Sequence, residues 1–330
     1  MTFIKKNNSI FIAGNNGMVG SSIKRSLEKN GYDNLLLPNR EDLDLLNYQK
    51  VKIWFEKNKP EIVILAAAKV GGIQANYKYP ADFILENLKI QTNIIENAWQ
   101  NGTKRLLFLG SSCIYPKFAK QPIKEEYLLN GPLENTNESY AIAKIAGIKL
   151  CSALRSQYGF DAISLMPTNL YGQGDNYNIH NSHVMPALIR KFYNAKVNEE
   201  SEVICWGTGA PKREFLYVDD LADACIFVLE NINTKEQLNN RMISELDGIL
   251  NIGTGIDISI KNLAELISSE LNYKGAIRWD SSKPDGTPKK LLDVSKASKL
   301  GWKAKTSLKE GIKLTISHFI NELNSNSLRI

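Results

Sequence analysis

The sequence is poor in cysteine, in long apolar runs and in blocks of like charge, and each shortage excludes a class of protein. Its 330 residues include four cysteines, Cys113, Cys151, Cys205 and Cys225, without Cys-x-x-Cys pairing or zinc-ligand spacing. A chain of this length needs no disulfide bonds to supplement its core. We therefore expect four free thiols, and neither a disulfide scaffold nor a metal site.

Membrane and nucleic-acid partners are excluded on similar grounds. No run of about 18 apolar residues occurs, and the first residues lead into an apolar stretch without the pattern of a signal peptide. The 41 basic and 35 acidic residues are spread along the whole chain without a run of like charge. We expect a cytoplasmic protein that contacts no membrane and no nucleic acid, with a net charge of +6 that suits an anionic ligand.

What is present is an alternation of short apolar runs with amphipathic stretches. Strands are expected at 9–13, 34–38, 62–66, 105–109 and 162–166, and helices at 17–30, 48–57, 87–100 and 140–158. Continuous apolar strands alternating with helices are typical of a parallel sheet covered on both faces. The pattern predicts an α/β Rossmann fold, a doubly wound parallel sheet.

The length also predicts a second, smaller unit, because 330 residues exceed what one core usually supports. After Gly172 the strand–helix rhythm loosens. We expect residues 1–172 to form the Rossmann domain and segment 213–257 to return to it, with a helix over 213–229 and a strand over 249–255. Residues 173–212 and 258–330 would form a smaller α/β C-terminal lobe that binds the substrate.

Three glycines follow the first expected strand and begin the first expected helix. Gly14, Gly17 and Gly20 have the GxxGxxG spacing that permits a tight turn, a close approach of backbone N–H groups to a pyrophosphate, and close helix packing. Arg40 stands at the end of the second expected strand, where an arginine favours the extra phosphate of NADP and an acidic residue favours NAD. The sequence predicts a dinucleotide site for NADP(H), although Glu41 lies beside the arginine.

Ser139-Tyr140-Ala-Ile-Ala-Lys144 carries the expected chemistry. At i, i+4 spacing Tyr140 and Lys144 share one helix face, where the ammonium is expected to lower the pKa of the phenol. A phenol so placed donates a proton to a carbonyl that receives hydride. Ser111 follows the strand at 105–109, at the sheet edge where ligands bind. Cys113 stands two residues further on, where alternation along a strand would direct it to the same side as Ser111.

These residues are part of a wider resemblance to a known family. The chain resembles the extended short-chain dehydrogenases and, within them, the GDP-L-fucose synthases, which are 3,5-epimerase/4-reductases of GDP-4-keto-6-deoxy-mannose. The similar segments extend over almost the whole chain: 66–73, 79–83, 107–117, 140–151, 166–172, 181–184, 213–216 and 282–288. The segment Ser-Ser-Cys-Ile-Tyr-Pro-Lys at 111–117 is the most specific of them.

The resemblance implies a role for each residue of the catalytic set. Ser111 and Tyr140 would hold the C4 carbonyl, and Lys144 would support Tyr140 and the nicotinamide ribose. Cys113 and His183 would move protons during epimerisation. Without the resemblance, we would expect Cys113 to be a small buried apolar residue, and His183 to be a histidine that caps a helix or lies in the core. His180 is a competing acid.

The resemblance also implies contacts with the cofactor and the nucleotide sugar. Those expected at NADP(H) are Gly14, Asn16, Gly17, Met18, Val19, Gly20, Arg40, Leu109, Gly110, Lys144, Pro167, Asn169, Leu170 and His183. Those expected at a GDP-linked 4-keto-6-deoxy sugar are Lys191, Trp206, Arg213 and Asp285. The family commonly carries an arginine in the glycine loop, where this chain has Asn15 and Asn16, so a relaxed preference between NADPH and NADH stays open.

Other activities and the assembly state stay open at this point. A GDP-4-keto-6-deoxy-heptose is an alternative substrate, with one or both epimerisations lost. Further alternatives are an NAD-dependent 4-epimerase, a 4,6-dehydratase, and a dinucleotide-binding protein that has no catalytic activity. The resemblance also implies a homodimer that pairs through helices at 82–99 and 138–158. The residues expected on the outer faces of these helices are Ile90, Ile94, Ile148 and Leu154.

Overall fold

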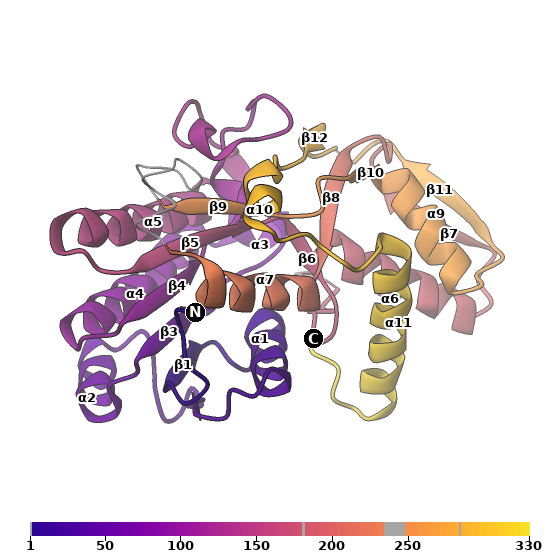
Figure 1. Cartoon of the computed structure of the whole chain (residues 1–330). Coiled ribbons are helices and arrows are strands. Elements are labelled where there is room, and N and C mark those ends of the chain that lie inside the picture. Colours follow the sequence, from indigo (N-terminus) through magenta and orange to yellow (C-terminus); the bar gives the residue numbers. More distant parts are fainter. Residues whose placement is uncertain (1, 180–181, 234–247, 284) are drawn as a thin grey trace.

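A six-stranded parallel sheet forms the centre of the larger part of the molecule (Figure 1). The computed structural model describes residues 2–179, 182–233, 248–283 and 285–330. The strand order is β2-β1-β3-β4-β5-β9, and all pairs are parallel. The strands are β1 (Ile10–Ala13), β2 (Leu35–Leu36), β3 (Ile62–Leu65), β4 (Arg105–Leu109), β5 (Ala162–Pro167) and β9 (Ile249–Ile252).

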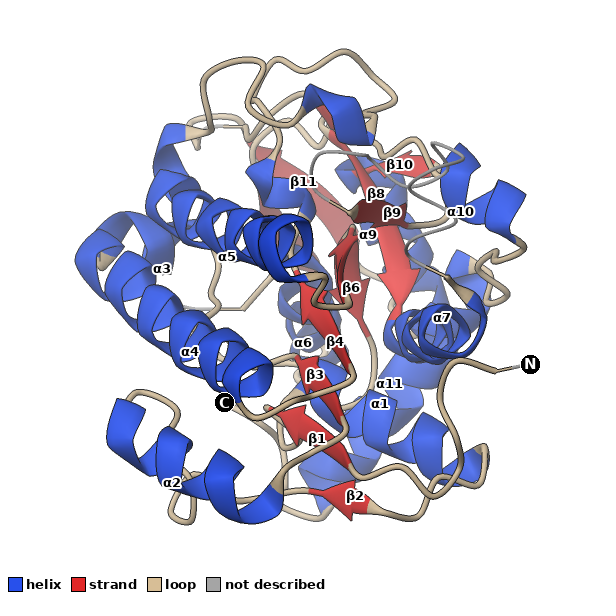
Figure 2. Cartoon of the chain, turned by 60° about the vertical axis from the view of Figure 1, so that its left-hand side comes forward, coloured by secondary structure: helices blue, strands red, loops and turns tan. Residues whose placement is uncertain are grey.

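Helices cover both faces of this sheet, as Figure 2 shows from the side. On one face lie α2 (Tyr48–Asn58), α4 (Pro80–Gln100) and α5 (Glu138–Tyr158), with the short α3 (Ile73–Lys78) next to α4. On the other face, α1 (Met18–Lys29) packs on α7 (Val218–Asn231), and α10 (Ser295–Leu300) contacts β9. Every residue of β1, β3, β4 and β5 is buried, because both faces are covered. The Rossmann-type α/β fold is confirmed.

The smaller part of the molecule has its own sheets and its own apolar core. One sheet holds β6 (Asn169–Tyr171), β8 (Lys212–Tyr217), β10 (Asp257–Ser259) and β12 (Lys289–Lys290), and the other pairs β7 (Glu202–Trp206) with β11 (Ala276–Asp280). Its helices are α6 (Val184–Val197), α9 (Ile260–Glu270) and α11 (Leu308–Asn324). The 3₁₀ turns η1 (Ser112–Ile114), η2 (Glu125–Tyr127) and η3 (Asn135–Asn137) lie in the loops between β4 and α5.

The segment after Lys212 differs from its prediction. A helix was expected over 213–229, but the chain first forms β8 and turns helical only at Val218. Phe215, Leu216 and Tyr217 are buried between the two parts of the molecule, and pairing with β6 satisfies the backbone there. α7 and β9 join the large sheet, whereas β8 joins the small one. The proposed domain boundaries stay a prediction.

The outer surface of α4 and α5 also differs from its prediction. Ile94, Ile148 and Leu154 are buried in the core beneath the large sheet, because they lie on the helix faces that pack inward. Ile90 packs against the same core. The apolar side chains that these helices do expose include Leu85 and Ile142.

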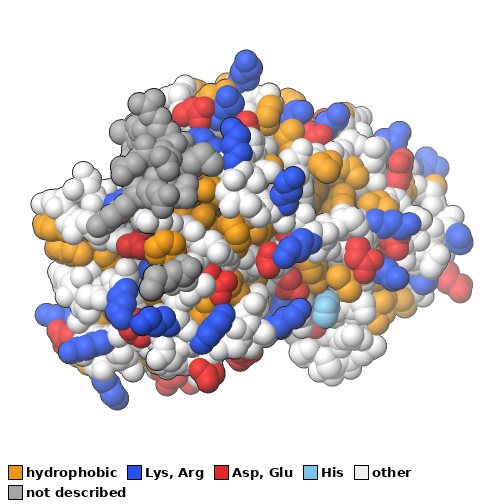
Figure 3. All heavy atoms as spheres, viewed as in Figure 1, with side chains coloured by type: hydrophobic (Ala, Val, Ile, Leu, Met, Phe, Trp, Pro, Cys, Tyr) orange, Lys and Arg blue, Asp and Glu red, His pale blue; other side chains and the backbone are white. Residues whose placement is uncertain are grey.

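Basic and acidic side chains are interspersed over the face seen in Figure 3. In the described part of the chain, no helix is both long enough and apolar enough to span a bilayer.

Candidate active site

The glycine loop brings the end of β1 against the segment that follows β3. Gly14 has φ +89°, and a Cβ atom on it would lie 2.8 Å from the Ala67 backbone. A Cβ atom on Gly20 would lie 2.1 Å from the carbonyl oxygen of Gly14, so α1 packs directly on the loop. Only glycine permits this conformation and these approaches. The start of α1 is thereby held at the carboxyl edge of the sheet, beside the point where strand order reverses between β1 and β3.

The N-terminus of α1 has the properties of an anion site. Gly17 is its N-cap residue and supplies no side-chain hydrogen bond, and the first turn contains no acidic residue. The leading N–H groups of a helix have no intrahelical partner, and they carry a partial positive charge. Met18 and Val19 are the first helical residues. These residues fit the pyrophosphate of a dinucleotide.

The loop residues near the expected adenosine end take different positions. The Asn15 side chain donates to the Leu37 carbonyl at 3.4 Å, which links the glycine loop to the residue after β2. Asn16 and Arg40 are exposed. An exposed guanidinium beyond β2 is free to meet a phosphate, and the contact itself stays a prediction.

Ser111 and Cys113 are brought together by a turn and not by a strand. β4 ends at Leu109, and residues Ser112–Ile114 form the 3₁₀ turn η1. Ser111 is its N-cap: the Oγ atom accepts a hydrogen bond from the Cys113 backbone N–H at 3.1 Å. The prediction of strand alternation here was wrong, because the serine hydroxyl satisfies the turn's first N–H instead.

Tyr140 and Lys144 lie in the first two turns of α5, on the side facing β4. The Lys144 Nζ atom donates to the Leu109 carbonyl at 2.8 Å, and its side chain is only 3% exposed. Burial lowers the pKa of Lys144 to about 8. Burial and the charge of Cys113 raise the pKa of Tyr140 above its ordinary value, against the lowering effect of a hydrogen bond with Ser111. The expected lowering by Lys144 is therefore not seen, and the raised pKa keeps the phenol protonated at neutral pH.

Cys113 lies among positive charges from the smaller part of the molecule. Its Sγ atom is 3.5 Å from the Nζ atom of Lys290. Burial raises the pKa of the thiol, but Lys290, the Ser111 hydroxyl and the charge of Arg213 together bring the pKa below its ordinary value. Lys290 was not among the residues predicted for the site. It stands 177 residues from Cys113 in the chain, and no local motif marks it.

The predicted nucleotide-end residues all lie in the smaller part of the molecule. Arg213 on β8 donates to the Thr287 carbonyl at 2.5 Å, and Asp285 accepts from the Thr208 N–H and hydroxyl at 2.9 and 2.6 Å. The other two residues are on different elements. Lys191 on α6 donates to the Ile204 carbonyl, and Trp206 at the end of β7 is 60% exposed with the Lys283 ammonium 5.8 Å from its ring centre.

The remaining predicted residues lie between the two parts. Pro167 ends β5, and Asn169 and Leu170 form β6, with the Asn169 side chain donating to the Glu214 carbonyl at 2.8 Å. His183 is the N-cap residue of α6. No hydrogen bond joins His183 and Cys113 among the described residues, and the role of His183 as acid stays a prediction. His180 lies outside the described residues.

The fold and these side chains define a class of enzyme. A Rossmann sheet with a glycine loop after β1, a serine after β4, and a Tyr140–Lys144 pair on the following helix is the active-site arrangement of a short-chain dehydrogenase. A thiol held beside an ammonium adds a candidate base to that set.

Comparison with known proteins gives the family. Residues 10–253 match the model of the NAD dependent epimerase/dehydratase family. GDP-L-fucose synthase 1 of Arabidopsis thaliana is 54% identical over 96% of this chain and 95% of its own, and GDP-L-fucose synthase of Escherichia coli (strain K12) is 52% identical over 94% and 96%. The chain belongs to the NAD dependent epimerase/dehydratase family and, within it, to the GDP-L-fucose synthases.

Solved structures agree with this placement. A GDP-6-OMe-4-keto-L-xylo-heptose reductase from C. jejuni superimposes with a TM-score of 0.92 at 39% identity, covering 97% of this chain and 99% of that chain. A GDP-L-fucose synthetase from Naegleria fowleri bound to NADP superimposes with a TM-score of 0.86 at 27% identity, covering 99% and 98%.

Proposed function

We propose that this protein converts GDP-4-keto-6-deoxy-D-mannose to GDP-L-fucose by epimerisation at C3 and C5 followed by reduction at C4 with NADPH. The observation that carries the proposal is the cluster of Ser111, Cys113, Tyr140 and Lys144 at the end of β4, in which a thiol stands beside a reductive set. An enzyme that only reduced a ketone would need no base at the Cys113 position.

The ketone makes the epimerisation chemically accessible. A carbonyl at C4 acidifies the hydrogens at C3 and C5, since the resulting carbanion is an enolate. Ser111 and the protonated Tyr140 would donate hydrogen bonds to the C4 oxygen and stabilise the enolate charge. The Cys113 thiolate would remove the proton on one face, and an acid, for which His183 is our candidate, would return a proton on the other face.

Reduction would use the same oxyanion contacts. Bound NADPH supplies hydride to C4. Tyr140 would transfer its phenolic proton to the C4 oxygen as the alkoxide forms, and the buried Lys144 ammonium would stabilise the tyrosinate left behind. Lys144 is held for this role by its bond to the Leu109 carbonyl.

The cofactor assignment rests on the fit of the residues present. The close-packed glycine loop, the uncapped N-terminus of α1 and the exposed Arg40 suit a dinucleotide with an additional phosphate. The NADP-bound relative of similar fold supports the same assignment.

We also propose a homodimer that pairs through the exposed face of α4 and α5. Leu85 and Ile142 are large apolar side chains exposed on these helices, which pack against each other. Sedimentation showing a monomer at micromolar concentration would contradict this assembly.

The test uses purified protein, GDP-4-keto-6-deoxy-mannose and NADPH in deuterated water. Loss of NADPH absorbance with deuterium at both C3 and C5 of the product is the expected result. Tyr140→Phe should abolish NADPH oxidation, whereas Tyr158→Phe, on the exposed far end of the same helix, should not. Cys113→Ser should sharply reduce deuterium incorporation.

A heptose substrate is the second candidate, favoured by the fold similarity to the C. jejuni heptose reductase. NADPH oxidation faster with a GDP-4-keto-6-deoxy-heptose, and deuterium at one carbon or none, would favour it. No oxidation with either sugar would refute both substrates.

A further inference from the structure

Lys290 differs from its neighbour Lys289 in having no carboxylate partner among the described residues. Lys289 pairs with Asp257, with 3.2 Å between Nζ and Oδ2. Among the described residues Lys290 forms no ion pair with a carboxylate, and its ammonium instead lies 3.5 Å from the Cys113 sulfur. A cation without a carboxylate partner next to a thiol stabilises the thiolate more than the thiol.

Hydrogen bonds to β8 and to the loop that follows Cys113 hold the backbone on both sides of Lys290. The Pro288 carbonyl accepts from the Lys212 N–H at 2.8 Å. The N–H groups that follow Lys290 are each bound by a different group. Leu291 donates to the Gln121 side chain at 2.8 Å, Leu292 to the buried Glu214 carboxylate at 2.9 Å, and Asp293 to the Ile123 carbonyl at 2.8 Å.

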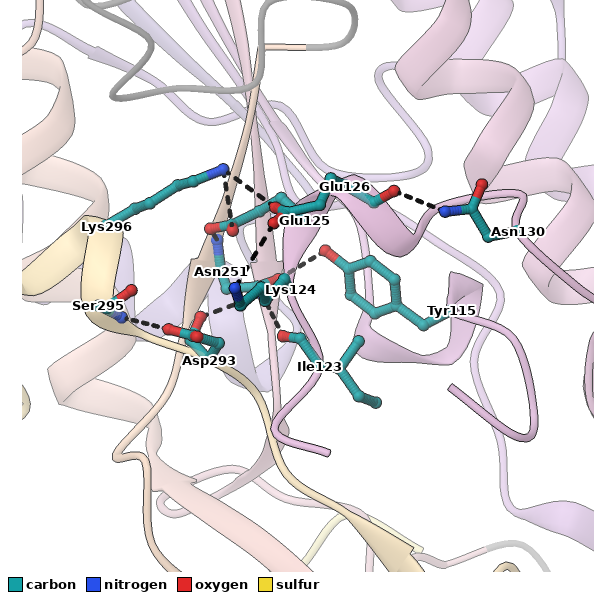
Figure 4. Close-up of polar contacts among 10 residues, drawn as sticks. All are labelled: Tyr115, Ile123, Lys124, Glu125, Glu126, Asn130, Asn251, Asp293, Ser295 and Lys296. Atoms are coloured by element: carbon teal, nitrogen blue, oxygen red, sulfur yellow. Dashed lines mark hydrogen bonds and ion pairs between the residues drawn. The ribbon is translucent and has the colours of Figure 1, made fainter. Parts of the chain in front are cut away.

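Asn251 joins this segment to the loop that follows Cys113 (Figure 4). Its side chain is fully buried on β9, accepts from the Tyr115 hydroxyl at 2.6 Å, and donates to the carbonyls of Ile123 and Asp293 at 2.9 and 3.2 Å. Tyr115 is two residues from Cys113, and Asp293 is three from Lys290. One amide therefore ties together the two segments whose side chains meet at the thiol.

The buried Glu125 reinforces the same junction. It accepts from the Asn251 N–H at 3.0 Å and forms an ion pair with Lys296 at 3.4 Å. Figure 4 shows these residues converging from η2, β9 and α10. Buried hydrogen bonds of this kind hold a fixed separation, since breaking any of them leaves a buried polar group without its partner.

We propose that Lys290 is the positioning residue that keeps Cys113 as a thiolate, and that the Asn251 junction holds its ammonium at the sulfur. The other groups facing the thiol are Ser111, Tyr140 and Arg213, from η1, α5 and β8. The thiol proton passes to solvent before the sugar is processed, and the thiolate then takes the proton from C3 or C5. This last role rests on the proposed function; the state of the thiol does not.

The test measures Cys113 alkylation by iodoacetamide as a function of pH in the enzyme without substrate, with the modified cysteine located by peptide mass spectrometry. Cys151, Cys205 and Cys225 are buried and serve as internal references. Lys290→Met should move the midpoint to higher pH and slow alkylation at pH 7.5 by about tenfold or more. Lys290→Arg should keep the midpoint near that of the wild type, and Lys289→Met is the matched control that should leave it unchanged.

An unchanged midpoint in Lys290→Met would overturn the proposal, as would an equal displacement in Lys289→Met. If Lys290→Met fails to fold, as judged by circular dichroism, Lys290→Gln replaces it, and the same displacement is required. The same variants are then assayed for deuterium incorporation, which should fall in Lys290→Met and recover at higher pH. A displaced thiol midpoint without deuterium incorporation by the wild type would refute the proposed function and leave the role of Lys290 standing.

Discussion

Replacing Asn251 tests whether the junction in Figure 4 holds the active site together. Asn251→Leu keeps nearly the same volume but removes three side-chain hydrogen bonds: one from Tyr115 and one each to the Ile123 and Asp293 carbonyls. At about 1 kcal/mol net for each bond, the free energy of unfolding should fall by about 3 kcal/mol. Tyr115→Phe removes only the first of these bonds and should cost about 1 kcal/mol.

Urea unfolding at pH 7.5, followed by circular dichroism, measures both values. The difference between the two variants is more informative than either alone, because it isolates the two bonds from Asn251 to the carbonyls of Ile123 and Asp293, of which Asp293 lies in the segment after Lys290. Asn251→Leu should also slow Cys113 alkylation at pH 7.5, since the ammonium is no longer held at the sulfur. A cost for Asn251→Leu no greater than that of Tyr115→Phe would refute the reasoning.

Three further predictions follow from single residues. Because the pKa of Lys144 is about 8, kcat for NADPH oxidation should fall as pH rises through that value. Lys144→Arg should move this decrease in kcat to higher pH. A kcat that stays constant from about pH 7 to 10 would contradict the prediction. Burial raises the pKa of Asp175 to about 7, so the folded state binds more protons than the unfolded state between about pH 4 and 7, and the free energy of unfolding falls as pH rises through that window. Asp175→Asn should therefore be more stable than the wild type at pH 8, by at most about 4 kcal/mol, with the gap closing below about pH 4; urea unfolding at both pH values checks this. Gly14→Ala should lower the free energy of unfolding in urea more than Gly31→Ala does, and it should also weaken NADPH binding. Both glycines have positive φ, but only a Cβ atom on Gly14 would meet other atoms, the Ala67 backbone at 2.8 Å. Equal losses of about 1 kcal/mol each would leave backbone strain alone as the cause.

Much of the fold was predictable because its signals are local. The buried strands are continuous apolar runs, and the glycine triplet and the Tyr140–Lys144 pair each lie within one turn or one helix. The errors came where a short segment had two possible structures. Residues 213–217 became a strand because pairing partners from β6 and β10 were available, and Cys113 entered a 3₁₀ turn because the Ser111 hydroxyl could cap it.

The faces of α4 and α5 show a second limit of sequence reasoning. From the sequence, Ile94 and Ile148 could lie either in a subunit interface or in the core. Only the packing of both helices on the sheet shows that they are buried in the core. An apolar side chain on a helix identifies a face that avoids water, but it does not say which neighbour covers that face.

The sequence by itself predicted the class of fold, the glycine loop proposed to hold the dinucleotide, and the serine, tyrosine and lysine of the proposed reductive set, because each depends on residues close together in the chain. The tertiary structure alone decided the surroundings of Cys113. Lys290, Asn251 and Glu214 come from distant segments, and their effect on the thiol depends on distances of about 3 Å that chain folding sets and sequence spacing does not. Burial likewise decided the protonation of Tyr140 and Lys144, since the pKa of a side chain depends on what surrounds it in space.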